Sequence, residues 1–377
     1  MFTSRSNLIN SLFKQSGVEV NGSQLYDIQI HHPGFYRKLL SKWSLGLGES
    51  YMDGDWDCEQ LDELISKLLR RDLNDSVKGI SRIHFILEII RVNLINLQSK
   101  KRAFQVGEAH YDAGNDLFER MLDPQMIYSC GYWERASNLN EAQEHKLKMI
   151  CEKLELKPGE SVLEIGCGWG GLAAYAAKNY GVQVLGITVS KEQQKLAQLH
   201  CKDLAVKIEL IDYRDLKGSF DKIVSVGMFE HVGKKNYRTY FNNTFRLLKD
   251  EGLLLLHTIG SDVSVVRTDP WIDKYIFPNG HIPSPTEICK TIEGLFLIED
   301  WHNFGQDYDK TLMAWFNNFD KHWIEISANY DQRFYRMWKY YLLSCAGYFR
   351  SRQGQLWQLI MSKRNRTQVY RSKRLVS

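Results

Sequence analysis

A glycine-rich turn over residues 164–171 is the feature that most narrows what this chain can fold into. It reads EIGCGWGG, follows the apolar run 162–165, and opens a segment of helical pattern that ends near Asn179. Glycines between a strand and a helix allow a tight bend and let a ligand approach the backbone closely. We therefore expect a ligand to bind at the start of this helix.

The turn belongs to a longer alternation of strand and helix patterns that begins near residue 157. Such alternation is typical of a parallel sheet with helices on both faces, so we predict an α/β fold with a doubly wound, Rossmann-like sheet. The segment 260–285 has no clear period and is either a lid or a long connection. The expected strands are 162–165, 182–187, 206–211, 222–226, 253–257, 296–300 and 356–361, with helices over 191–200 and 237–248.

The first hundred residues carry no catalytic motif and alternate short helical patterns with turns, with breaks expected at Gly46, Gly48 and Gly54. We predict a small, mainly helical N-terminal domain over residues 1–97, a linker over 98–105 and a catalytic domain over 106–377. No apolar run reaches the roughly 18 residues that cross a bilayer. The seven cysteines lack CxxC spacing, which predicts neither disulfides nor a metal site and favours a reducing cytoplasm.

The identity of the ligand depends on the acidic residues near the turn. Gly166, Gly168 and Gly171 satisfy G-x-G-x-x-G, but a dinucleotide site also needs an acid about 20 residues further on, and residues 186–190 contain none. Glu164 stands two residues before the first glycine, and Asp212 follows the third expected strand. This pattern resembles the first motif of class I methyltransferases and implies S-adenosylmethionine as the ligand.

Further segments narrow the resemblance. Residues 110–116, 128–133, 227–233 and 257–260, together with 301–305, 345–347 and 45–54, resemble the cyclopropane-fatty-acyl-phospholipid synthases nearly end to end. The resemblance implies transfer of a methylene group from S-adenosylmethionine to the cis double bond of unsaturated acyl chains in membrane phospholipids. Asp212 would bind the adenine amine, and Thr188 and Gln193 would replace the missing ribose acid. The implied S-adenosylmethionine contacts are Tyr128, Ser129, Glu164, Ile165, Gly166, Cys167, Gly168, Trp169, Gly170, Gly171, Thr188, Gln193, Asp212, Tyr213 and Arg214.

The reaction requires a base, because an alkene that attacks an activated methyl group leaves a carbocation, and the ring closes when a methyl proton is lost. The site must also align the alkene and exclude water. The resemblance implies that bound bicarbonate accepts the proton and is held by Cys130, Glu230, His257, Tyr308 and the backbone of Ile259. Glu230 would then be protonated beside the anion or relay through His257, whereas a direct carboxylate base at Glu230 is the alternative.

Cys345 lies in a Cys-Ala-Gly segment that is part of the resemblance to the synthases, so it is a candidate nucleophile. The chemistry needs no covalent cysteine, however, and a buried structural role is the other interpretation.

Three other functions fit part of the pattern. A lipid C-methyltransferase would form the same cation but leave a methyl branch, and a non-catalytic protein could bind lipid with the same fold. A nucleic-acid methyltransferase could use the eight Lys and Arg residues after residue 349, which no acid accompanies; without a nucleic-acid module, we expect no nucleic-acid partner. That basic stretch also suits anionic phospholipid, or it is merely solvated. We expect a homodimer attached peripherally to the cytoplasmic face of the membrane, with the N-terminal domain engaging the bilayer or pairing two subunits.

Overall fold

The computed structural model describes residues 2–70, 114–265 and 267–374. The chain divides into two compact units, one formed by residues 1–95, 266–278 and 308–354 and the other by residues 96–265, 279–307 and 355–377. The predicted linker, residues 98–105, lies outside the described residues, and so does most of the segment 110–116. No helix in the described ranges is both long enough and apolar enough to span a bilayer.

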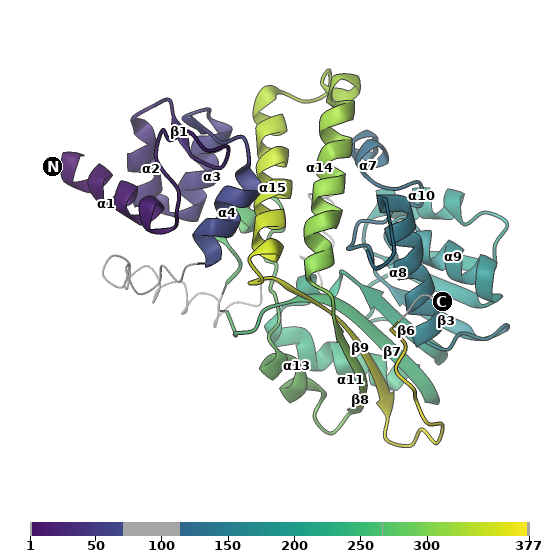
Figure 1. Ribbon diagram of the computed structural model, residues 1–377. Helices are drawn as coiled ribbons and strands as arrows, with labels where there is room; N and C mark the ends of the chain where they lie inside the picture. Colours follow the sequence, from purple (N-terminus) through teal and green to yellow (C-terminus); the bar gives the residue numbers. More distant parts are fainter. Residues whose placement is uncertain (1, 71–113, 266, 375–377) are drawn as a thin grey trace. The chain divides into compact units, whose positions relative to one another are not determined.

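The second unit is built on a twisted sheet whose described strands run in the order β5-β4-β3-β6-β7-β9-β8 (Figure 1). Strands β3 to β7 are parallel, and β9 pairs antiparallel with both β7 and β8. The fold prediction is therefore confirmed. The strands are β3 (Ser161–Ile165), β4 (Gln183–Thr188), β5 (Val206–Leu210), β6 (Phe220–Val226), β7 (Leu248–Gly260), β8 (Phe296–Asn303) and β9 (Gln355–Lys363).

Helices cover both faces of this sheet because alternate residues of its central strands are apolar on both sides. One core joins the sheet to α8 (Leu139–Lys153), α9 (Gly171–Tyr180) and α10 (Lys191–His200). The other core joins the opposite face to α11 (Tyr237–Leu247) and α13 (Pro285–Ile292). Odd-numbered residues of β7, among them Leu253 and Leu255, face the α8 side, and His257 continues that row.

The first unit is mainly helical. It contains α1 (Phe2–Gln15), α2 (Gly34–Lys42), α3 (Ser44–Met52), α4 (Leu61–Arg70), α12 (Pro270–Tyr275), α14 (Gln306–Ile326) and α15 (Gln332–Arg350), with a two-stranded ribbon of β1 (Gln29–Ile30) and β2 (Trp56–Asp57). The long helices α14 and α15 thus group with the N-terminal residues, although they lie between two strands of the sheet in sequence.

Two of the three expected glycine breaks are wrong. Gly46 and Gly48 lie inside α3, and only Gly54, with φ +79°, marks the turn after it. A Cβ at Gly46 would come 2.0 Å from the carbonyl oxygen of Lys38, and one at Gly48 would come 2.4 Å from the Trp271 ring. These glycines let neighbouring segments pack closely instead of bending the chain.

Candidate active site

The glycine turn lies at the carboxyl edge of the sheet, where open α/β sheets bind ligands. Gly166, Gly168 and Gly170 have φ values of +81°, +54° and +86°, which favour glycine. A Cβ at Gly168 would meet no atom within 4 Å, whereas a Cβ at Gly171 would come 2.4 Å from the carbonyl oxygen of Gln125. The turn is therefore open at Gly168 and closely packed at Gly171.

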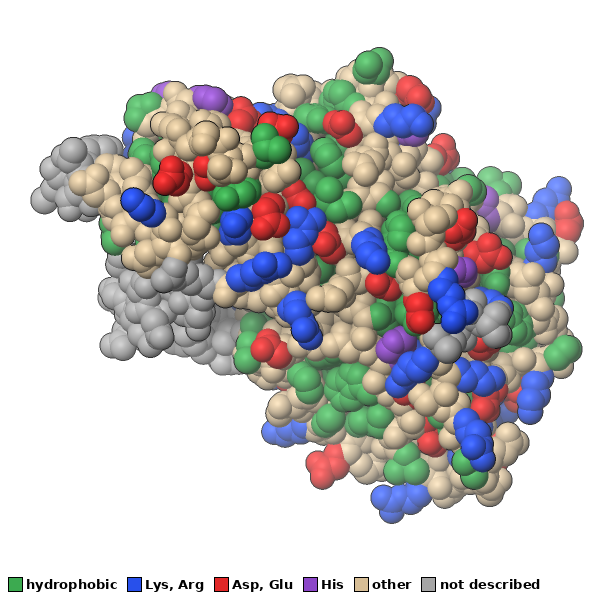
Figure 2. All heavy atoms as spheres, viewed as in Figure 1, with side chains coloured by type: hydrophobic (Ala, Val, Ile, Leu, Met, Phe, Trp, Pro, Cys, Tyr) green, Lys and Arg blue, Asp and Glu red, His purple; other side chains and the backbone are tan. Residues whose placement is uncertain are grey.

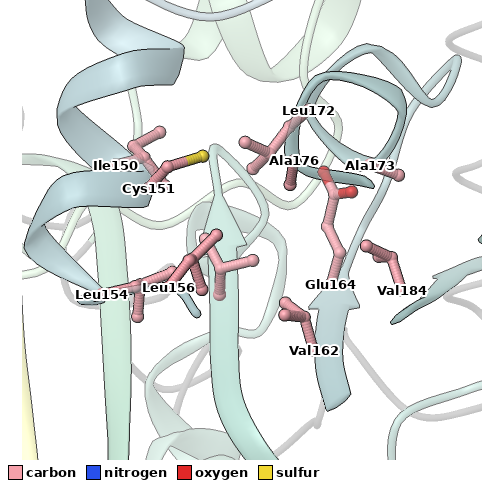
Figure 3. A pocket seen from close by; sticks show the side chains of 11 residues that line it. Ile150, Cys151, Leu154, Leu156, Val162, Glu164, Leu172, Ala173, Ala176 and Val184 are labelled. Carbon is pink, nitrogen blue, oxygen red and sulfur yellow. The ribbon is translucent and has the colours of Figure 1, made fainter. Parts of the chain in front are cut away.

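Glu164 points under the turn rather than out from the sheet edge. Figure 3 shows its side chain beside Leu172, Ala173 and Ala176 of α9, in a cavity of about 10 Å³ with otherwise apolar walls. Burial raises the pKa of Glu164 to about 8, although the charge of Lys146 and the backbone N–H of Ala173 oppose the shift. Its role in binding S-adenosylmethionine stays a prediction.

The polar residues after β4 and β5 are already ordered. Thr188 Oγ1 donates to Gln193 Oε1 at 2.9 Å, and both side chains are buried. Asp212 accepts two side-chain hydrogen bonds from Arg214, each at 2.7 Å. Thr188 ends β4 and Asp212 follows β5, and these two strands are neighbours in the sheet. Their roles in binding the ribose and the adenine stay predictions.

The segment 128–130 packs against the turn through aromatic rings. Phe118 of α7 (Asn115–Met121) contacts both Tyr128 and Trp169, with ring centroids 5.2 and 4.9 Å apart. Buried Lys146 donates to Ser129 Oγ at 2.9 Å, and Gln143 donates to the Ser129 carbonyl at 2.8 Å. The structure thereby brings together two of the segments predicted to hold S-adenosylmethionine.

Glu230 follows β6 in a short 3-10 helix, η2 (Phe229–His231). Its Oε1 accepts the backbone N–H of Ile259 at 2.7 Å, and its Oε2 is buried with no hydrogen-bond partner within the described ranges. Burial raises the pKa of Glu230 to about 7, so this carboxyl is partly protonated at neutral pH. The predicted pairing of Glu230 with the backbone of Ile259 is thus present in the structure.

His257 lies two residues before Ile259 on the same strand and is 1% exposed. Gln358 Nε2 lies 3.2 Å from His257 Nδ1, while His257 Nε2 is buried with no partner among the residues that the structure describes. Burial, aided by the positive charges of Lys146 and Lys153, holds the pKa of His257 well below its usual range. The imidazole is therefore neutral.

The remaining predicted residues are distributed between the two units. Cys130 is buried in the second unit, with Sγ 3.1 Å from the Gly131 carbonyl oxygen. Tyr308 belongs to the first unit, where its ring stacks on Phe349 with centroids 4.5 Å apart. Cys345 lies in α15, and burial raises the pKa of its thiol to about 12. A protonated thiol is a poor nucleophile, which supports a structural role for Cys345.

The buried polar residues behind the site were not predicted from the sequence. Lys146 and Lys153 are 1% and 0% exposed and lie on the sheet-facing side of α8, and Gln358 is buried in β9. The available signal was weak: a glutamine interrupting the apolar run 356–361 and two lysines seven residues apart in a helix that otherwise packs on the sheet.

Comparisons with known proteins agree with this arrangement. The sequence model of the family described as mycolic acid cyclopropane synthetase matches residues 98–359. The chain is 57% identical to the cyclopropane-fatty-acyl-phospholipid synthase of Escherichia coli strain K12 over 358 residues, covering 94% of this chain and 93% of that protein. It is 38% identical to a probable fatty acid methyltransferase of Pseudomonas putida, covering 67% of this chain and 68% of that protein.

A solved structure, the cyclopropane synthase MmaA2 from Mycobacterium tuberculosis, superposes with a TM-score of 0.65 at 30% identity and covers 69% of this chain and 98% of that one. The cyclopropane synthase CmaA1, solved with S-adenosylhomocysteine, gives the same TM-score at 31% identity, with the same coverage of both chains. The chain therefore belongs to the cyclopropane synthase family of S-adenosylmethionine-dependent methyltransferases.

Proposed function

We propose that this chain transfers a methylene group from S-adenosylmethionine to the cis double bond of unsaturated acyl chains in phospholipids and so forms cyclopropane chains. The observation that carries the proposal is its similarity to the Escherichia coli synthase over nearly the whole length of both chains. The glycine turn, the ordered Thr188–Gln193 pair and Asp212 supply a site for the methyl donor at the sheet edge.

The reaction needs surroundings in which a carbocation survives until a proton leaves. The residues near His257 offer such surroundings, because its ring lies 5.7 Å from that of Phe304, which in turn packs against Tyr132. Aromatic faces attract cations, and buried apolar walls keep out the water that would trap one.

A proton acceptor completes the site, and we infer that it is bicarbonate. Two buried polar atoms at the sheet edge, Glu230 Oε2 and His257 Nε2, lack partners within the described part of the chain. A neutral imidazole N–H and a protonated carboxyl can both donate to an anion, and the pKa shifts of the two groups favour these forms. Bicarbonate held there would supply the base for the methyl proton. Tyr308 and Cys130 are assigned to this site by the resemblance alone.

The proposal is tested by incubating the protein with S-adenosylmethionine and vesicles of unsaturated phospholipid, followed by mass spectrometry of the acyl chains. We expect each modified chain to gain one CH₂ unit and to stop reacting as an alkene. Chains that gain the mass but keep a double bond would identify a branching C-methyltransferase instead, and unmodified lipid would contradict the proposal.

The protein must also reach chains inside a bilayer, and we infer that it attaches peripherally to the inner face of the membrane through its basic C-terminal stretch. Three cations of this stretch already pair within the second unit: Lys363 with Asp250, Arg366 with Glu155 and Arg374 with Asp300. Arg364, Arg371 and Lys373 are exposed. On the face shown in Figure 2, acidic side chains are interspersed among basic ones, so the exposed cations of the stretch are the better candidates for lipid contact.

Replacing Arg364, Arg371 and Lys373 with glutamine is expected to weaken binding to anionic vesicles by about tenfold or more, because each cation near such a surface contributes about 1 kcal/mol. The salt dependence of binding should flatten as well. Vesicle sedimentation with anionic and neutral lipid measures both effects. Lys178, Lys202 and Lys207, which are exposed elsewhere in the unit, provide a control with the same change in charge. Equal losses in both variants, or none in either, would show that the stretch is only solvated.

We further infer that residues 1–97 help to engage the bilayer or to pair two subunits into a homodimer. Their described part is mainly helical, and deleting residues 1–97 is expected to impair activity on vesicles more than binding of S-adenosylmethionine.

A further inference from the structure

A row of polar side chains crosses the sheet directly behind His257. His257 of β7 is the register partner of Gln358 in β9, and Gln358 is in turn the partner of His302 in β8. Partners in neighbouring strands project from the same face, so the three side chains form one line. Lys153, the last residue of α8, reaches into this line with a side chain that is 0% exposed.

The contacts of Lys153 fix the orientation of the Gln358 amide. Lys153 Nζ lies 2.8 Å from Gln358 Oε1 and 3.0 Å from His302 Nδ1. An ammonium group has only donors, and the carboxylate of Asp300 favours this charged form of Lys153. The amide oxygen of Gln358 therefore faces Lys153, and its NH₂ group faces His257.

The amide orientation decides where His257 carries its proton. Gln358 Nε2 lies 3.2 Å from His257 Nδ1, and because the amide nitrogen is a donor, Nδ1 must accept. A neutral imidazole with one accepting nitrogen carries its proton on the other. The proton of His257 thus lies on Nε2, the atom without a partner among the described residues.

Lys153 is itself held by an anion. Asp300 Oδ2 lies 3.8 Å from Lys153 Nζ, and the Asp300 carboxylate also accepts hydrogen bonds from Ser372 at 2.7 Å and from Arg374. Burial lowers the pKa of Lys153 to about 7, against the opposing charge of Asp300. Burying a lysine and a glutamine in an otherwise apolar layer is costly, and a purely structural need is met more cheaply by apolar side chains.

We propose that Gln358 and Lys153 are positioning residues that hold His257 in its Nε2-protonated tautomer, so that Nε2–H is presented as a fixed hydrogen-bond donor to an anion in the active site. This inference rests on the proposed function. It makes His257 a donor and excludes a relay in which Nε2 accepts a proton from Glu230. The strand order, with β9 between β7 and β8, places Gln358 next to His257.

The tautomer can be observed directly in the intact protein. In long-range ¹H–¹⁵N spectra of protein labelled at histidine, the resonance that disappears in His257→Asn should show a protonated Nε2 and a bare Nδ1. A wild-type protein with the proton on Nδ1 would overturn the inference even if it makes cyclopropane chains. The result is therefore separate from the test of the proposed function, which depends on the product alone.

Two variants add a kinetic readout. Gln358→Glu places an acceptor at Nδ1 and an ion-pair partner at Lys153, so the proton should move to Nδ1 and kcat should fall roughly 10²–10³-fold, the usual cost of losing one fixed donor. Lys153→Met should lower kcat less, because the Gln358 amide can then rotate and still donate to Nδ1 in one of its two orientations. Lys153→Arg, which keeps a positive charge, should retain more activity than Lys153→Met. KM for S-adenosylmethionine should stay the same in all three.

The controls make the same changes outside the row. Gln183→Glu alters an exposed residue of β4, and Lys148→Met alters a partly exposed lysine of α8; neither should change kcat. If Gln358→Glu retains wild-type kcat, or if its His257 keeps the proton on Nε2, the positioning role is wrong. If Gln358→Glu does not fold, the spectrum of the wild-type protein still shows which nitrogen of His257 carries the proton, and so still tests the inference.

Discussion

Replacing Glu230 with glutamine is expected to reduce turnover about 10²–10⁴-fold, the range for loss of one positioned acid–base group. The amide oxygen can still accept the N–H of Ile259, so the segment should stay in place while the proton of the carboxyl is lost. Calorimetry should therefore show unchanged binding of S-adenosylmethionine. Glu293→Gln, at an exposed position, provides the matched control.

The dependence of activity on pH shows which form of Glu230 works. Because burial raises its pKa from 4.5 to about 7, the carboxyl is protonated below that pH and ionised above it. If protonated Glu230 donates to bound bicarbonate, kcat/KM measured at a fixed bicarbonate concentration should fall as the pH rises through about 7. An increase over the same range, together with no response of bicarbonate-depleted protein to added bicarbonate, would establish Glu230 as the direct base. Near-normal turnover of Glu230→Gln would remove the residue from the mechanism.

Replacing Gly171 with alanine is expected to damage both the fold and the cofactor site. The new Cβ would come 2.4 Å from the Gln125 carbonyl oxygen and 2.4 Å from Ile127 Cδ1. The opposing segment cannot easily withdraw, because the Asp123 carboxylate binds the backbone N–H groups of Gln125 and Ile127 at 2.9 and 3.1 Å. We expect a loss of about 1–3 kcal/mol in the free energy of unfolding, as for overpacking elsewhere. Affinity for S-adenosylmethionine should fall at least about tenfold.

Alanine at Gly168 separates the two effects. A Cβ there meets no atom within 4 Å, so its cost to stability comes only from the backbone at φ +54°. Gly159→Ala has the same kind of cost, with φ +83° and open space, but lies in the turn before β3. Isothermal titration and thermal melts of the three variants should show that Gly168→Ala loses affinity for S-adenosylmethionine while Gly159→Ala does not. Equal affinities in those two variants would mean that the ligand does not approach the turn at Gly168.

Local patterns in the sequence predicted where the strands lie along the chain, but not which strands lie next to one another in the sheet. The expected strand 253–257 is the centre of a strand that runs over Leu248–Gly260, and the expected strand 356–361 lies within Gln355–Lys363. That the last strand inserts between β7 and β8 depends on tertiary pairing, which no local period records. The row His257–Gln358–His302 follows from that insertion and was therefore invisible in the sequence.

The predicted site residues divide in the same way. Gly166, Gly168 and Gly171 were recognisable because a turn motif constrains neighbouring positions. The bond from Ile259 to Glu230 joins segments 29 residues apart, and only the resemblance brought the two residues together in advance. The sequence of the basic stretch could not show which of its cations are available to bind lipid, because Arg366 and Arg374 pair with acids that are distant in sequence.

The most direct test of the account is the fate of a deuterated methyl group. The protein is incubated with S-adenosylmethionine carrying a fully deuterated methyl group and with vesicles of a phospholipid that has one cis double bond, and the acyl chains are then examined by mass spectrometry. Ring closure removes one of the three deuterons, so the account predicts a saturated chain, resistant to alkene reagents, that retains two. A product that retains all three deuterons beside a surviving double bond would contradict it.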